Sequence, residues 1–153
     1  MRPEELMIGD YAQVNRDGLC INKDTIVEIR EIDANNTFNT HIGSASCRPL
    51  DDIQYENGIW CDDLSPIPLT TEILEKNGFI KRYDYQWEYR DNSCAIVVNI
   101  APQIEIDGEA LGTPPINVNL EGALFDINIT SDMCVHELQH ALRLCGIDKE
   151  IEP

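Results

Sequence analysis

The stretch that decides the fold is residues 65–78, which read Ser65-Pro66-Ile67-Pro68-Leu69-Thr70-Thr71-Glu72-Ile73-Leu74-Glu75-Lys76-Asn77-Gly78. Two prolines at this spacing disfavour helix and favour an extended linker. Thr70 can cap a helix N-terminus, and Gly78 stands where a helix commonly ends. The pattern therefore predicts a linker followed by a short helix over Thr71–Asn77.

The part of the chain before this stretch carries short β-strand patterns. Ile8–Val14 and Thr25–Ile32 are rich in residues that favour strands, and Asp17-Gly18 is typical of a two-residue turn. Asn57-Gly58 predicts a second hairpin turn. Frequent turns between short strands favour a small, strongly curved sheet, so residues 1–67 are predicted to form a small β-barrel-like lobe.

The part after the stretch returns to β patterns and ends in a helix. The predicted strands form an antiparallel meander over four segments: Phe79–Arg90, Cys94–Ile100, Ile104–Glu109 with a turn at Asp107-Gly108, and Ile116–Ile129 with a turn at Glu121-Gly122. Ser131–Cys145 is amphipathic, can be capped by Thr130 or Ser131, and is followed by Gly146, so a closing helix is predicted there. Residues 68–153 are expected to form a second lobe, and the fold class is α+β.

Composition limits the classes of partner. The chain has 153 residues, of which 28 are acidic and 11 basic, giving a net charge of −17. Such a surface repels phosphate backbones and anionic lipids, so we expect neither nucleic-acid nor membrane binding. The first six residues, Met1-Arg2-Pro3-Glu4-Glu5-Leu6, do not have the pattern of a signal peptide, and a cytoplasmic location is expected. The six cysteines show no Cys-x-x-Cys spacing and are expected to be reduced and mostly buried.

One short motif carries possible chemistry. His136-Glu137-Leu138-Gln139-His140 has the H-E-x-x-H pattern on a predicted helix. Residues four apart share a helix face, so His136 and His140 could bind one Zn²⁺ while Glu137 acts as general base. This pattern would make the chain a zinc-dependent peptidase or hydrolase.

Helix geometry favours a simpler interpretation of the same motif. The apolar stripe of the closing helix is predicted on the side away from His136 and His140, which would then lie on a solvated face. No histidine follows His140 to serve as a third ligand, and Glu150 and Glu152 lie in a tail that is expected to fray. We therefore expect surface histidines, with Zn²⁺ as the alternative and no cofactor as the leading hypothesis.

An aromatic pattern and two acidic pairs offer other candidate sites. Tyr83, Tyr85, Trp87 and Tyr89 alternate with polar residues, which on one strand would place four aromatic side chains on one face. Such a face is a possible ligand or partner surface, although a core face is the simpler interpretation. Asp51-Asp52 and Asp62-Asp63 lack the spacing of an EF-hand loop and are expected to be solvated turn residues.

Three segments resemble a family of small uncharacterised proteins from gut anaerobic bacteria and their prophages or other mobile elements. They are residues 5–11 (ELMIGDY), residues 66–79 (PIPLTTEILEKNGF) and residues 135–142 (VHELQHAL) followed by Gly146. The resemblance implies an intracellular protein without an assigned activity. In that family the last segment is similar to V-H-x-L-Q-[N/H], which implies that Glu137 and His140 are not fixed features of it.

These patterns support three functional hypotheses. The leading one is a non-catalytic, acidic protein-interaction module of mobile-element origin, with a host or phage protein as partner. The alternative is the zinc hydrolase that uses His136, Glu137 and His140. The third is an acidic DNA mimic that occupies a nucleic-acid site on another protein, for which the charge of −17 is the basis.

Overall fold

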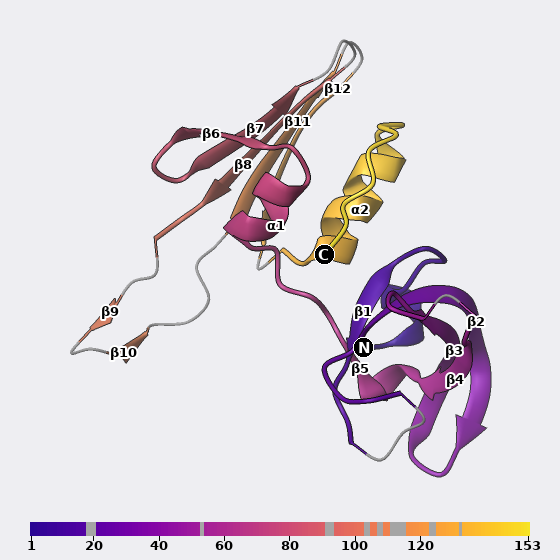
Figure 1. Ribbon diagram of the computed structural model, residues 1–153. Helices are drawn as coiled ribbons and strands as arrows, with labels where there is room; N and C mark the ends of the chain where they lie inside the picture. The colour runs from indigo at the N-terminus through magenta and orange to yellow at the C-terminus, as the bar shows by residue number, and fades with distance from the viewer. Residues whose placement is uncertain are drawn as a thin grey trace. The chain divides into compact units, whose positions relative to one another are not determined.

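The computed structural model describes the chain except for short interruptions: it covers residues 1–17, 21–52, 54–90, 94–102, 105–106, 109–110, 116–122, 125–131 and 133–153. The fold is α+β, built mostly from antiparallel sheets with few helices (Figure 1). The chain divides into two compact units, residues 1–67 together with Pro153, and residues 68–152.

The first unit is a five-stranded antiparallel sheet in the order β4-β3-β2-β1-β5. Its strands are β1 (Tyr11–Val14), β2 (Ile26–Phe38), β3 (His41–Pro49), β4 (Asn57–Trp60) and β5 (Leu64–Ser65). Two single-turn 3₁₀ helices accompany them, η1 (Pro3–Glu5) and η2 (Cys61–Asp63). The described residues form an open sheet, so the expected barrel closure is not found.

Alternating burial along these strands produces the core of the first unit. Val27 and Ile29 of β2 are fully buried, as are Ala12 and Val14 of β1. The other members of the cluster are Leu6, Ile21, Ala45, Cys47, Ile59, Cys61 and Leu64. One sheet face is thus apolar, as expected for a half-buried antiparallel sheet.

The sequence prediction for the first unit was wrong in two places. Asn57-Gly58 is not a hairpin turn, because both residues lie in β4 and pair with Cys47 and Ser46 of β3. Strand β3 was not predicted at all. The Asp17-Gly18 turn includes residue 18, which lies outside the described residues.

The second unit contains a five-stranded antiparallel sheet in the order β12-β11-β8-β7-β6. Its strands are β6 (Ile80–Tyr83), β7 (Gln86–Arg90), β8 (Cys94–Ile100), β11 (Ile116–Gly122) and β12 (Phe125–Ser131). Between β8 and β11, the short strands β9 (Glu105–Ile106) and β10 (Glu109–Ala110) pair with each other as a separate sheet. Cys94–Ile100 was predicted with the correct ends, whereas Phe79–Arg90 is two strands.

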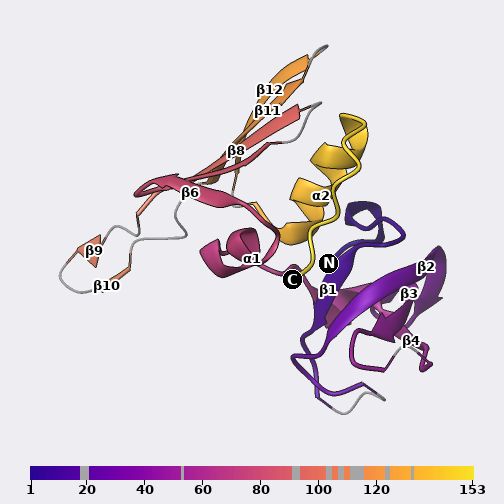
Figure 2. The same ribbon diagram turned by 45° about the horizontal axis from the view of Figure 1, so that its top comes forward.

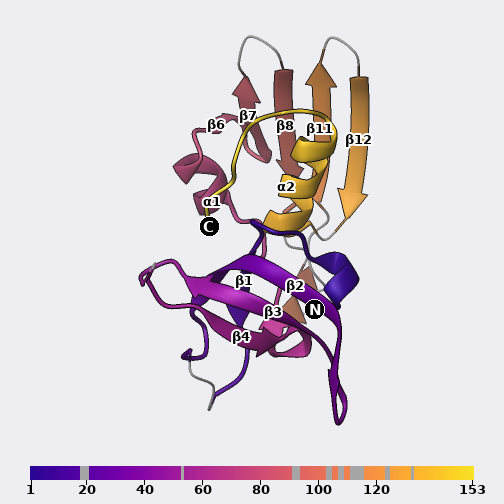
Figure 3. The same cartoon turned by 90° about the vertical axis from the view of Figure 1, so that its right-hand side faces the viewer.

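Both helices belong to the second unit. Helix α1 (Thr71–Lys76) begins as predicted, with the Thr70 side chain accepting a hydrogen bond from the Ile73 amide. Helix α2 (Val135–Leu144) begins later than predicted, because Ser131 still belongs to β12. Figure 3 shows α2 lying across one face of the sheet, and Figure 2 shows it from a second direction beside β8 and β11.

Strand register assigns the side chains of this sheet to two faces. Trp87, Ile96, Val98, Val118 and Leu120 are buried and in register across β7, β8 and β11, on the face that α2 covers. Leu138 and Leu142 of α2 are fully buried. We call this the covered face and the opposite side the open face.

The cysteines agree with the expectation of reduced, mostly buried thiols as far as they are described. Cys47, Cys61 and Cys94 are buried, Cys134 and Cys145 are half-buried, and none of these five described cysteines forms a disulfide. Burial raises the pKa of the Cys47 thiol to about 12, which keeps it protonated at neutral pH. Cys20 lies outside the described residues.

Gly43 has a backbone conformation and a close neighbour that exclude a side chain. It has φ +76° inside β3, close to a register irregularity with β2, and a Cβ there would collide with the ring of Pro3. We expect Gly43→Ala to lower the free energy of unfolding by about 1–3 kcal/mol, through left-handed backbone strain and the clash. Urea denaturation of the variant measures this. The control is Gly58→Ala, whose Cβ would meet no atom within 4 Å; an equal loss in both variants would contradict the assignment.

Candidate functional sites

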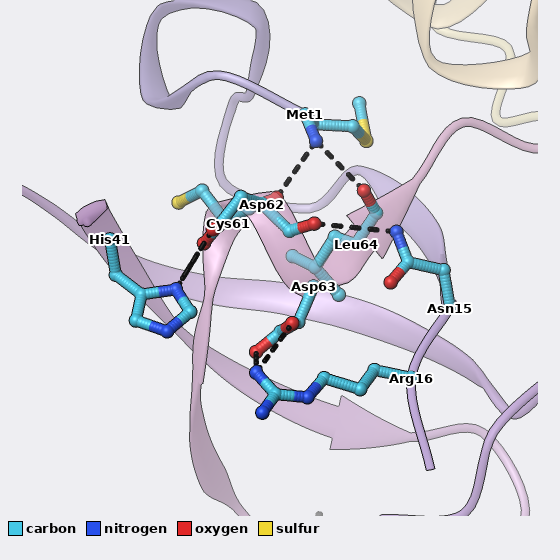
Figure 4. A network of polar contacts seen from close by, with 8 residues as sticks. All are labelled: Met1, Asn15, Arg16, His41, Cys61, Asp62, Asp63 and Leu64. Atoms are coloured by element: carbon cyan, nitrogen blue, oxygen red, sulfur yellow. Dashed lines mark hydrogen bonds and ion pairs between the residues drawn. The ribbon is translucent and has the colours of Figure 1, made fainter.

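His41, Asp62 and Asp63 form the first candidate site, in the first unit (Figure 4). His41 begins β3, while both aspartates belong to η2, which directly follows β4. The His41 ring is stacked on Trp60, with 5.2 Å between centroids and 12° between planes. Its Nδ1 lies 2.9 and 2.8 Å from the two carboxylate oxygens of Asp62. Stacking and this contact together fix the orientation of the imidazole.

The second aspartate of the cluster is buried and already faces a cation. Asp63 is 5% exposed, and its two oxygens lie 3.3 and 3.5 Å from Nη1 of Arg16. The η2 turn is further held by Asn15, whose amide donates to the Asp63 carbonyl oxygen at 2.9 Å. The Met1 nitrogen donates to the carbonyl oxygens of Cys61 and Leu64, at 2.8 Å each (Figure 4).

This cluster has one imidazole and two carboxylates within reach of one ion. The three ligand atoms all lie within 4.8 Å of one another. Among the described residues, this is the group of side chains that could hold a metal ion. Arg16 supplies the positive charge that a buried carboxylate requires, so the cluster is also stable as a structural network without an ion. The expectation that Asp62 and Asp63 are both solvated turn residues is wrong for Asp63. The sequence could not show that His41 lies near them, because only the pairing of β3 with β4 brings these distant residues together.

The H-E-x-x-H helix is the second candidate site, and its two histidines do share a face. The rings of His136 and His140 lie 5.6 Å apart between centroids, edge to face. His136 is only 6% exposed, so the expectation that both rings face solvent is wrong. Helix periodicity alone therefore did not predict the burial of His136.

Glu137 has a structural role that competes with catalysis. Its carboxylate accepts a hydrogen bond from the Cys134 amide at 2.9 Å and so caps the first turn of α2. Among the residues whose side chains are described, no third ligand joins His136 and His140 in a group able to hold a metal. The structure therefore brings two candidate ligands together, without a third among the side chains that it describes.

Gln139, at the centre of the motif, holds the C-terminal tail. Its side-chain nitrogen donates to the Lys149 carbonyl oxygen at 3.0 Å, and its side-chain oxygen accepts from the Ile151 amide at 2.7 Å. Asn77, at the end of α1, binds both the amide and the carbonyl oxygen of Glu152, at 2.9 and 2.7 Å. Ile151 is fully buried. The tail that was expected to fray is thus pinned to both helices.

The four aromatic residues of the third candidate site do not form one surface. A turn after Tyr83 separates β6 from β7, so the alternation continues onto a different strand. Trp87 lies on the covered face and is 5% exposed, and Tyr89 packs against Phe79 at 5.6 Å between centroids. Tyr83 and Tyr85 are exposed, by 73% and 52%. Trp87 is thus a core residue and Tyr89 is half-buried, and an exposed surface remains at Tyr83.

A hollow of about 500 Å³ on the open face is the fourth candidate site, and sequence reasoning missed it. Its lining residues come from four strands: Arg82, Tyr83, Gln86, Glu88, Val97, Asn119 and Glu121. Register places Glu88, Val97 and Asn119 in one row across β7, β8 and β11. The short side chain of Val97 therefore lies between longer polar side chains on both neighbouring strands.

Glu88 is held between two guanidinium groups beside this hollow. Nε of Arg82 lies 2.8 Å from one carboxylate oxygen of Glu88, and Nε and Nη2 of Arg90 lie 3.0 and 2.8 Å from the other. The hydrogen bonds from Arg90 and Arg82 hold the pKa of Glu88 below its ordinary value. Glu88 is therefore ionised at neutral pH, and the three side chains together carry one net positive charge.

Comparison with models of protein families, with curated proteins and with solved structures finds no match to this chain. The family resemblance of its three segments therefore stays a prediction. Neither helix in the described part of the chain has the length and apolar character that crossing a membrane requires.

The role of Gln139 leads to a prediction about stability. We expect Gln139→Ala to lower the free energy of unfolding by about 1–3 kcal/mol, because it leaves the buried Ile151 amide without its acceptor. The Ile151 amide should also exchange with deuterium faster than in the unmodified chain. Chemical denaturation and hydrogen exchange measure the two effects.

The matched control is Leu144→Ala on the same helix. Leu144 is 86% exposed, so its substitution should change stability by less than about 0.5 kcal/mol. A Gln139→Ala variant as stable as this control, with an unchanged Ile151 amide, would contradict the pinned tail.

Proposed function

We propose that this chain is a non-catalytic protein-interaction module and that the open face of the second unit is its recognition surface. The observation that carries the proposal is the hollow across β6, β7, β8 and β11. The sheet needs one apolar face for its core, and helix α2 covers that face. The open face is not required for this core and can meet a partner.

The composition of the open face fits a protein partner. Tyrosine and arginine are enriched where protein interfaces gain most of their energy, because each combines a large contact area with hydrogen-bonding groups. Tyr83 is 73% exposed, and the Arg82 side chain is 52% exposed. Ile80, in the row next to them, is 58% exposed and adds apolar area.

The row structure of the open face gives it a definite shape. In the middle strand β8, Ala95 and Val97 present short side chains. Their register partners on β7 are Arg90 and Glu88, and those on β11 are Glu121 and Asn119. Long polar side chains thus flank Val97, which lines the hollow, and Ala95, which is only 4% exposed; we name this feature the β8 groove.

The proposal is tested by whether the capture of a partner depends on the open face. The full chain, the double variant Tyr83→Ala/Asn119→Ala and the control Tyr55→Ala would each be immobilised and exposed to extract from cells that express the chain. Tyr55 is 45% exposed and belongs to the first unit, so it controls for loss of an exposed tyrosine.

We expect a polypeptide that the unmodified chain and the control retain equally and that the double variant retains at least about tenfold less. That ratio corresponds to the loss of one strong interface contact, about 1.4 kcal/mol. Equal retention by all three proteins, or no retained polypeptide, would contradict the proposal.

A further inference from the structure

We infer that the β8 groove receives an extended segment of the partner whose carboxylate side chains meet Arg82 and Arg90. This inference rests on the proposed function, because it names the chemistry of the partner at the same face. It follows from the shape of the groove, from its amide side chains and from its charge.

The shape of the groove matches an extended chain. Along β8, side chains on the open face repeat every second residue, at Ala95, Val97 and Asn99, which corresponds to a spacing of about 6.6 Å. An extended segment lying along β8 has the same repeat. Its alternate side chains can therefore meet successive rows of the groove, which a helix with a rise of about 5.4 Å per turn would not match.

The walls of the groove carry amide side chains. Elsewhere in this chain, amide side chains bind backbone groups. Asn77 binds the amide and the carbonyl oxygen of Glu152, and Gln139 binds the Lys149 carbonyl oxygen and the Ile151 amide. In both cases a planar amide side chain donates to and accepts from one short segment of backbone that lies outside any helix or strand. The β8 groove has Gln86 on its β7 side and Asn119 on its β11 side, each partly exposed. Nε2 of Gln86 also donates a hydrogen bond to Oδ1 of Asn99 at 3.0 Å, so the Gln86 side-chain oxygen is the group that it offers to a partner backbone.

The charge of the β7 wall selects the side chains of the partner. Two guanidinium groups share the single carboxylate of Glu88, and their side chains are 52% and 63% exposed for Arg82 and Arg90. A guanidinium has five N–H donors, of which Glu88 engages one from Arg82 and two from Arg90. The remaining donors are suited to a carboxylate, which arginine binds with two parallel hydrogen bonds.

The overall charge of −17 does not prevent this local attraction. Charges farther away than about 8 Å are largely screened at physiological ionic strength. On the opposite wall, Glu121 is exposed and repels acidic groups. The carboxylates of the partner segment should therefore point to the β7 side, which also fixes the position of the segment across the groove.

Selection from a displayed library of random eight-residue peptides tests the inference on the full chain. The selected peptides would be synthesised, and their affinity measured by fluorescence anisotropy for four proteins. These are the unmodified chain, Arg82→Gln/Arg90→Gln, Tyr83→Ala/Asn119→Ala, and the control Lys81→Gln. Lys81 lies on the same strand as Arg82, but its Nζ is 5.5 Å from the ring of Trp87, on the covered face.

We expect selected peptides to carry Asp or Glu at alternate positions. Their affinity should fall about tenfold or more in both double variants and stay within about twofold in Lys81→Gln. Replacing their acidic residues by arginine should abolish binding to the unmodified chain. Circular dichroism and thermal unfolding would verify that each variant folds, so that a loss of affinity reports on the groove.

The two proposals fail in different ways. Two outcomes would overturn the acidic-segment inference and leave the proposed binding face intact. In the first, the peptides lose affinity for Tyr83→Ala/Asn119→Ala but bind Arg82→Gln/Arg90→Gln with unchanged affinity. In the second, the selected peptides are enriched in basic residues. Peptides that bind both double variants as tightly as the unmodified chain, or a selection without any binder, would overturn both.

Discussion

The structure of the second unit depends on the burial of one face of its sheet. Alternation along β7, β8 and β11 directs Trp87, Ile96 and Val118 to the same side, where all three are buried. Helix α2 lies over this face, and Nε1 of Trp87 contacts Glu75 of α1 at 3.4 Å. Burying side chains of this size stabilises a fold by about 1.5–3 kcal/mol each. The two amide side chains of Gln139 and Asn77 then hold the tail against the helices. All of these elements contribute to one face, and the face opposite α2 is not needed for the core.

This division explains why the motif that suggests catalysis and the surface that suggests binding lie in different places. The H-E-x-x-H residues belong to the structural side of the unit: Glu137 caps α2, Gln139 holds the tail, and His136 is buried. The hollow with Tyr83 and its polar neighbours belongs to the other side. We therefore propose recognition rather than zinc chemistry as the function of this chain.

Local signals in the sequence predicted the parts of the fold that local physics determines. The cap at Thr70, the strand Cys94–Ile100 and the α+β class are confirmed. The errors arose where contacts distant in sequence decide. Asn57-Gly58 has the composition of a turn, yet pairing with β3 draws it into a strand. His136 was expected to be exposed because helix periodicity takes no account of contacts from residues distant in the sequence.

The hollow on the open face could be predicted from the sequence even less than the fold. The hollow combines residues from four strands, and only the register of β7 and β11 against β8 places Glu88 beside Val97 and Asn119. The tyrosine alternation indicated part of this surface, at Tyr83, but assigned Trp87 to the same face. The turn between β6 and β7 is what separates them.

Hydroxyl-radical footprinting of the folded chain, normalised to the chain unfolded in urea, tests the central claim that one sheet face is covered and the other is open. Tyr83 should be oxidised at nearly its unfolded rate, since it is 73% exposed, and Trp87, at 5%, should be protected at least about tenfold. Comparable protection of both residues, or oxidation of Trp87 at its unfolded rate, would contradict the account.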